Sequence, residues 1–204
     1  MKIRVEELRR IIREAAKSRG RLVIVDVQPE YEDKINFDVA DMLRMASGYS
    51  RILVLWNGPE LGMSSEQELK GYYFEKLDYD EEALENFLSR ADFFDKGYGF
   101  FRDVMDHPCF SPQSVVKIVK YMIDKDITNI SELSSEDVES IGVKELLVDE
   151  LENYGFYIPD LKNVLSGWNG SDMVGGQEDE CMAEVEILSK ALGINLNKIR
   201  NFIY

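Results

Sequence analysis

Cysteine and histidine are scarce in this sequence, which has only Cys109, Cys181 and His107 among its 204 residues. Two cysteines cannot build a disulfide framework, and with a single histidine they cannot supply the four ligands of a zinc site at the usual spacing. The composition is typical of a protein from a reducing, intracellular compartment. We therefore expect a cytoplasmic protein in which Cys109, beside a proline, is structural.

The sequence also has few positively charged residues relative to acidic ones, and no long apolar run. The chain carries 24 Lys and Arg residues against 39 Asp and Glu residues, which gives a formal charge of −15. Such a charge repels a phosphate backbone, so we expect no nucleic-acid partner. No apolar run approaches the ~20 residues that span a bilayer, and the N-terminus lacks the apolar core of a signal peptide. A soluble protein that acts on a small molecule, away from membranes, fits best, and its exposed helices are compatible with a homodimer.

The length favours a single α/β domain over residues 1–204 with additions to it. Val5, Leu8, Ile11 and Ile12 recur at helical spacing, which predicts an N-terminal helix within residues 1–20. Residues 126–168 contain several short helical patterns, each with its own Ser or Asp start, and no strong strand. We interpret this segment as a helical insertion.

Apolar runs alternate with amphipathic segments through the rest of the chain. Helices are predicted at 38–46, in two pieces between 64 and 88, from Ser111 with Pro112 at its first position, and at 180–193. Strands are predicted at 22–25, 51–56, 91–96, 171–176 and 198–204. Strands that alternate with helices predict a mainly parallel sheet with helices on both faces, because parallel neighbours need a crossover. The expected fold is therefore a three-layer α/β/α sandwich.

Three reactive side chains lie at or just after the ends of these predicted strands: Asp26, Lys96 and Cys181. Ligands bind at the carboxyl ends of the strands in such sheets. A cysteine nucleophile needs a base to accept its proton and a positive group to stabilise the anion. A helix N-terminus also favours a thiolate, which offsets the acidic residues next to Cys181. An aspartate, a lysine and a cysteine at three strand ends predict a catalytic site.

Three short motifs surround these residues. They are VIVDVQPEY, in which an apolar strand ends in Asp-x-Gln, DKGYGFF, in which an aromatic stretch follows the lysine, and GGQEDECM, which carries the cysteine. In this order they resemble the motifs of the isochorismatase-like cysteine hydrolases. The resemblance covers roughly residues 21–110 and 170–204 and leaves the N-terminal helix and the insertion unmatched.

The resemblance implies a catalytic triad and a hydrolase activity on a small amide, carbamoyl or related substrate. Asp26 would accept the thiol proton, Lys96 would balance the carboxylate and the reacting centre, and Cys181 would attack the electrophilic carbon. Some members of the family bind a metal through histidines after the second strand. The corresponding stretch NGPELGMSS has no histidine, so we expect a site without metal or cofactor.

The resemblance also suggests which groups surround the triad. Backbone N–H groups at Gly176, Gln177 and Glu180 would form the oxyanion site, in a glycine pair that tolerates unusual backbone angles. We expect three residues to bind the substrate: Gln28 in the first motif, Asn57 at the end of the second strand, and Tyr98, which would stack on a planar substrate.

Simpler interpretations of each residue stay open. Asp26 also suits a strand-end carboxylate that accepts from nearby N–H groups, Lys96 a solvated loop lysine, and Cys181 a small buried helix residue. A protein that keeps the isochorismatase-like fold and binds a partner through the insertion at 126–168, without catalysis, is the main alternative. A doubly wound domain that binds nucleotide phosphates is a third, weakened by the lack of a glycine-rich loop after the first strand.

Overall fold

A computed structural model of the chain describes residues 19–58, 65–97, 99–101, 105, 110–153 and 155–204, with the side chains of residues 19, 150 and 152 left out. The helix predicted within residues 1–20 lies outside these ranges, except that its last two positions begin the first strand. Among the described helices, none has the length and apolar character that crossing a bilayer requires.

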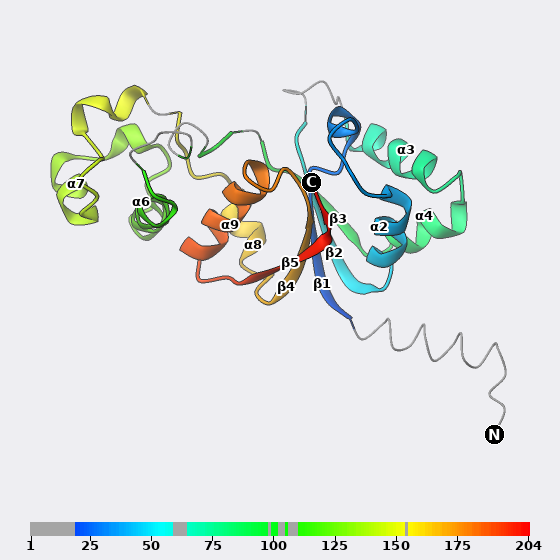
Figure 1. Cartoon of the computed structure of the whole chain (residues 1–204). Coiled ribbons are helices and arrows are strands. Elements are labelled where there is room, and N and C mark those ends of the chain that lie inside the picture. Colours follow the sequence, from blue (N-terminus) through cyan, green and yellow to red (C-terminus); the bar gives the residue numbers. More distant parts are fainter. Residues whose placement is uncertain (1–18, 59–64, 98, 102–104, 106–109, 154) are drawn as a thin grey trace. The chain divides into compact units, whose positions relative to one another are not determined.

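The centre of the fold is a five-stranded parallel sheet in the order β3-β2-β1-β4-β5 (Figure 1). Its strands are β1 (Arg19–Val25), β2 (Tyr49–Trp56), β3 (Ala91–Asp95), β4 (Ser171–Gly175) and β5 (Leu196–Ile203). In register, Val23 of β1 pairs with Leu53 of β2 on one side and with Met173 of β4 on the other. The predicted α/β class and parallel sheet are thereby confirmed.

The strand order places a topological switch point at β1. From β1 the chain first builds β2 and β3 on one side and later builds β4 and β5 on the other. Ligand sites in sheets of this kind lie beyond the carboxyl ends of the two strands where the order reverses. Asp26 follows one of these strands and Gly175 ends the other, so both lie where this rule places a site.

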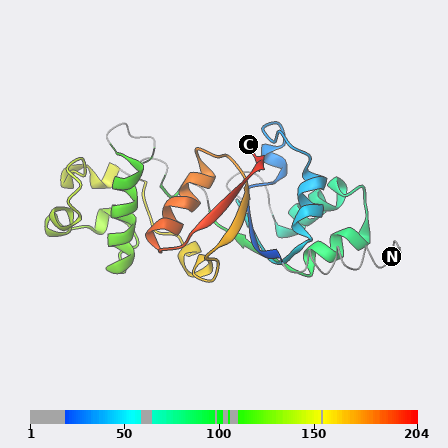
Figure 2. The same ribbon diagram turned by 60° about the horizontal axis from the view of Figure 1, so that its bottom comes forward.

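Three helices follow the first strands and lie on the same side of the sheet in both views (Figures 1 and 2). They are α2 (Val39–Ala46), α3 (Glu66–Lys76) and α4 (Glu81–Leu88). Each begins as the sequence predicts, since the side chains of Asp38, Ser65 and Asp80 accept from backbone N–H groups of the first turn.

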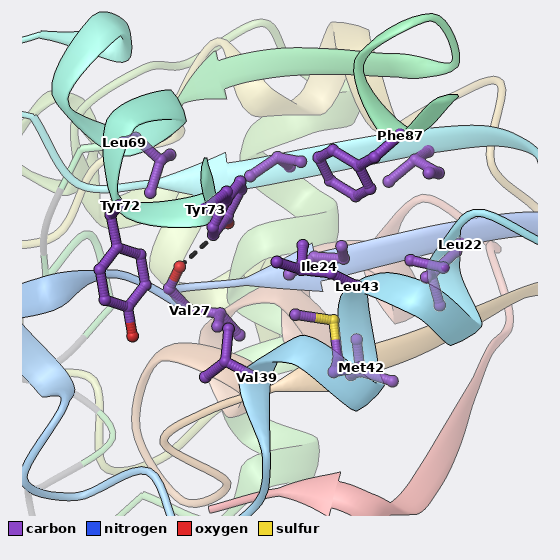
Figure 3. Packing of buried hydrophobic residues seen from close by; sticks show 14 of the residues in the cluster. Leu22, Ile24, Val27, Val39, Met42, Leu43, Leu69, Tyr72, Tyr73 and Phe87 are labelled. Carbon is purple, nitrogen blue, oxygen red and sulfur yellow. Dashed lines mark hydrogen bonds between the residues drawn. The ribbon is translucent and has the colours of Figure 1, made fainter. Parts of the chain in front are cut away.

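The core under these helices is continuous and apolar. Alternate residues of β1 and β2, among them Leu22, Ile24 and Ile52, pack against α2 residues such as Leu43 and against Phe87 of α4 (Figure 3). Each fully buried Leu, Ile or Phe contributes about 1.5–3 kcal/mol relative to an exposed position. This packing holds the sheet and its three helices together as one layered body.

The chain divides into two compact units. The first unit contains the described residues up to Asp95, together with Ser171–Gly176 and Asn197–Tyr204, and the second contains Lys96–Gly170 and Gln177–Leu196. The second unit is larger than the helical insertion predicted at 126–168, because it also takes in the segment from Lys96 and the helix that starts at Cys181. The three-layer arrangement stays a prediction, since it depends on helices of the second unit.

The second unit is helical. Its described helices are α6 (Pro112–Asp124), η3 (Ile130–Glu132), α7 (Ser135–Ile141), η4 (Val148–Asn153), α8 (Leu161–Leu165) and α9 (Cys181–Ala191). Within 126–168 the described residues form short helices and one isolated bridge between Asn129 and Tyr157, as the sequence predicts. The helix α9 stops where the sequence places its glycine, since Gly193 has a φ of 72°.

Candidate functional site

Asp26 directly follows β1 and adopts an unusual backbone conformation. Its φ is 51°, in the left-handed region that only a few residue types, aspartate among them, enter at modest cost. Its N–H donates to the Leu55 carbonyl at 2.9 Å, and its own carbonyl accepts from the Tyr204 hydroxyl at 2.7 Å. The residue is fully buried, with 0% of its surface exposed. Hydrogen bonds to its backbone N–H and carbonyl therefore hold Asp26, with its buried carboxylate, at the end of the central strand.

The glycine pair at the end of β4 is required by close packing. A Cβ on Gly175 would lie 1.9 Å from the Val25 carbonyl oxygen, and a Cβ on Gly176 would lie 2.6 Å from the Tyr204 ring. Gly175 also has a φ of 110°. The bend was predicted at Gly176 and Gln177, whereas the positive φ of this stretch lies one position earlier, at Gly175. Because neither glycine has a side chain, β4 and Tyr204 can approach the end of β1, which Asp26 directly follows.

Gln28 and Asn57, two predicted substrate-binding residues, lie side by side. The Gln28 side chain donates from Nε2 to the Asn57 carbonyl at 3.2 Å, and its Oε1 accepts from the Asn57 N–H at 2.9 Å. The Asn57 side chain in turn donates to the Tyr31 hydroxyl at 3.2 Å. Both residues are buried. The Gln28 side chain and the Asn57 backbone therefore join the ends of β1 and β2. Contact of Gln28 or Asn57 with a substrate stays a prediction.

Lys96 immediately follows β3 and is buried, with 2% of its surface exposed. Its Nζ donates to the Gly97 carbonyl at 3.3 Å and lies 5.9 Å from the centre of the Phe100 ring. The interpretation of Lys96 as a solvated loop lysine is therefore wrong. Lysine is almost never fully buried without a partner or a role. Tyr98, the third predicted substrate-binding residue, lies outside the described residues, as do His107 and Cys109.

Cys181 is the first residue of α9 and is 3% exposed. The preceding Glu180 makes no side-chain capping bond to the helix. The helix dipole at such an end favours a thiolate over a thiol. The cysteine thus occupies the position in its helix that the sequence predicts for a nucleophile, and it is also buried, as the simpler interpretation expects.

Two of the three predicted oxyanion N–H groups, those of Gly176 and Glu180, already have partners within the protein. The Gly176 N–H donates to the Val25 carbonyl at 3.0 Å, and the Glu180 N–H donates to the Gln177 carbonyl at 3.2 Å. The Gln177 carbonyl also accepts from the N–H of Met182 at 3.0 Å. An oxyanion role for Gly176 or Glu180 would require these bonds to break, and the role of Gln177 stays a prediction.

Glu184 is a buried residue that sequence reasoning missed. It lies one turn after Cys181 on the same face of α9 and is 3% exposed. Its Oε1 accepts from the Phe101 N–H at 2.8 Å. The available signal was a charged residue at helical spacing from the apolar Ile187 and Leu188, because an acid on the apolar face of a helix needs a partner.

The structure places the three predicted catalytic residues in different units. Asp26 belongs to the first unit, while Lys96 and Cys181 belong to the second. Their meeting at one site stays a prediction. Compared with protein-family models, with curated proteins and with solved structures, the chain matches none of them at a significant level. The functional argument therefore depends on the residues themselves.

Proposed function

We propose that the chain is an isochorismatase-like cysteine hydrolase that cleaves a small amide, carbamoyl or related substrate through a covalent bond to Cys181, without a metal. The observation that carries this proposal is the burial of three reactive groups, with 0% of Asp26, 2% of Lys96 and 3% of Cys181 exposed. Ionisable groups removed from water are costly for stability and concentrate at functional sites.

The connectivity of the sheet supports a common location. Asp26 follows β1, Lys96 follows β3, and Cys181 comes after the short turn that leaves β4. Carboxyl ends of parallel strands share one edge of a sheet. Each of the three residues thus follows the carboxyl end of a strand, and ligands bind near such ends in folds of this class.

Each residue has a distinct role in the proposed reaction. Asp26 accepts the proton of the Cys181 thiol, and the sulfur attacks the substrate carbonyl to form a C–S bond. Lys96 stabilises the negative charge that develops. The C–N bond then breaks, and the leaving amine takes the proton from Asp26. Water hydrolyses the thioester, releases the acid and returns the proton to the thiol.

Alkylation of Cys181 by iodoacetamide tests the proposal, with mass spectrometry to separate it from alkylation of Cys109. We expect faster alkylation at Cys181 than at Cys109. Asp26→Asn and Lys96→Ala should slow it about tenfold or more. Asparagine tolerates the left-handed conformation of position 26, so the first substitution removes charge with little change in backbone. Asp95→Asn changes a strand-end carboxylate outside the triad and serves as the control.

Equal reactivity of both thiols, together with indifference to Asp26→Asn and Lys96→Ala, would rule the hydrolase out. The second candidate function, a partner-binding module, then gains weight. It is favoured by Leu147 and Val148, which are 50% and 40% exposed within the helical insertion. Association of that module with its partner should be lost in Leu147→Asp. If association survives both Leu147→Asp and Val148→Asp, the insertion is not the binding surface.

A further inference from the structure

A second candidate site lies within the first unit, between the segment that follows β1 and helix α3. A pocket of about 240 Å³ is found there. Its lining, as far as the described residues show, contains none of Asp26, Lys96 and Cys181. The pocket is therefore separate from the proposed catalytic residues.

One wall of the pocket is apolar and rigid. It is formed by Ile35, Phe37 and Val39. The Phe37 ring is held edge-on against Phe202, with ring centres 5.6 Å apart, and also contacts Tyr204 at 6.2 Å. A wall fixed in this way suits an apolar ring or chain, because its side chains lose little conformational entropy when a ligand binds.

The part of the pocket formed by α3 contains a buried hydroxyl, that of Tyr72, which lacks a hydrogen-bond partner among the described residues. Tyr72 is 7% exposed. The neighbouring Tyr73 differs, since its hydroxyl donates to the Val27 carbonyl at 2.9 Å (Figure 3). Buried hydroxyl groups are nearly always hydrogen-bonded, so an exception needs an explanation. A ligand that bonds to the Tyr72 hydroxyl supplies one.

The electrostatic field at this hydroxyl is negative. Burial, and after it the carboxylates of Glu32, Glu30 and Glu75, raise the pKa of Tyr72 above its ordinary value. Glu32 and Asp38 also line the pocket. A cation already occupies this field, because the Lys76 ammonium pairs with Glu32 and lies 5.1 Å from the centre of the Tyr72 ring. A second cation would be attracted by the same carboxylates and would compete with the Lys76 ammonium for them.

The volume limits the ligand to a small molecule. Its volume of about 240 Å³ lies below the roughly 300 Å³ at which pockets for drug-sized ligands begin. A single ring or a short branched chain fits.

We propose that this pocket binds a small organic cation, an ammonium group carried on one ring or a short apolar chain. The ammonium donates to the Tyr72 hydroxyl oxygen and is attracted by Glu32 and Asp38. The apolar part lies against Ile35, Phe37 and Val39. The site does not depend on the proposed hydrolase activity.

Benzylammonium is a suitable probe, titrated at pH 7 into the chain of 204 residues with labelled Ile and Val methyl groups. We expect saturable shifts of the Ile35 and Val39 methyl signals. Benzyl alcohol, of the same shape without charge, should bind about tenfold more weakly or worse, since bonds that involve a charged group are the stronger ones. Benzoate should not shift these signals.

Two adjacent tyrosines give a matched pair of variants. Tyr72→Phe should weaken benzylammonium binding about tenfold, whereas Tyr73→Phe should leave it unchanged. Lys76→Met removes the competing ammonium and should tighten binding. Thermal melting of each variant checks that it folds. The proposal is overturned if benzylammonium gives no saturable shift, if benzyl alcohol or benzoate binds equally well, or if Tyr72→Phe binds as wild type does.

Discussion

The carboxylate of Glu184 accepts a hydrogen bond from the backbone N–H of Phe101 at 2.8 Å, across 83 positions of the chain. This bond ties the segment that begins at Lys96 to the first turn of α9, where Cys181 lies. Both residues are buried in the second unit. Glu184 is therefore placed to position the lysine-bearing segment relative to the cysteine.

Replacing Glu184 should affect both stability and the reactivity of the thiol. Glu184→Ala leaves the buried Phe101 N–H without its acceptor and should cost about 1–3 kcal/mol, measured by urea unfolding. Glu184→Gln keeps an acceptor oxygen and should cost less. If Glu184 positions the segment, Glu184→Ala also changes the pH profile of Cys181 alkylation, and Glu184→Gln largely preserves it.

Glu186→Ala is the control on the same helix, because Glu186 is only half-buried and pairs with Lys190 at 3.6 Å near the helix surface. An alkylation profile that is the same in wild type and Glu184→Ala would limit Glu184 to a packing role.

The elements of the sheet and its three helices were predictable because their signals are local. Asp80 before α4, for example, is followed by two acidic residues and an apolar periodicity, which together specify a helix start. The start of β1 was not predictable in the same way. Arg19–Arg21 carry little strand signal of their own and become strand by pairing with β2, where Arg19 lies opposite Tyr49.

Tyr72 and Tyr73 should respond oppositely to loss of their hydroxyl groups. Tyr73→Phe removes the bond to the Val27 carbonyl and should cost about 0.5–1.5 kcal/mol. Tyr72→Phe removes a buried hydroxyl with no partner among the described residues and should be neutral or stabilising in the absence of ligand. Urea unfolding of the two variants measures the difference. Equal destabilisation would mean that Tyr72 has a bond that the structure does not show.

The glycine pair should tolerate no side chain. Gly176→Ala forces the Tyr204 ring away and breaks its bond to the Asp26 carbonyl, at a cost of about 1–3 kcal/mol. Gly175→Ala should cost more, because its Cβ meets backbone and its φ of 110° strains any side chain. Gly20→Ala is the control, since among the described residues no atom beyond its two chain neighbours lies within 4 Å of the added Cβ.

A double variant separates the causes. If the Tyr204 ring is the obstacle, Gly176→Ala should cost little further free energy of unfolding in a Tyr204→Ala background. A cost that remains unchanged in that background would place the conflict elsewhere.

The residue types of the site could be predicted from the sequence, but the contacts around them could be predicted only in part. The position of Cys181 at a helix start followed from the sequence, because a glycine pair precedes it and apolar residues recur at helical spacing after it. The requirement for Gly175 and Gly176 depends on Val25 and Tyr204, which are distant in sequence. The same is true of the Gln28 side chain, whose partner is the backbone of Asn57. Such contacts are decided by the sheet and leave no local pattern.

The stability of the second unit should depend on the ionisation of Asp137. Its carboxylate accepts from the Ser134 hydroxyl at 2.6 Å, the Ser134 N–H at 2.8 Å and the Tyr121 hydroxyl at 2.7 Å. The bonds from Ser134 first, and then the one from Tyr121, lower the pKa of Asp137 from 3.8 to about 2. Because the folded-state pKa lies below the unfolded one, this stabilisation is present above about pH 4 and is lost as the pH falls toward 2.

Asp137→Asn should therefore lower the melting temperature at pH 7 and have a progressively smaller effect between about pH 4 and pH 2, as circular dichroism would show. Asp160→Asn is the matched control, because Asp160 precedes α8 without a side-chain capping bond. Other carboxylates also titrate in this range, so the comparison of wild type with each variant isolates the contribution of one residue. A difference between wild type and Asp137→Asn that stays constant down to pH 2.5 would contradict the assignment, since it would show that the bonds to Ser134 and Tyr121 do not depend on the charge of Asp137.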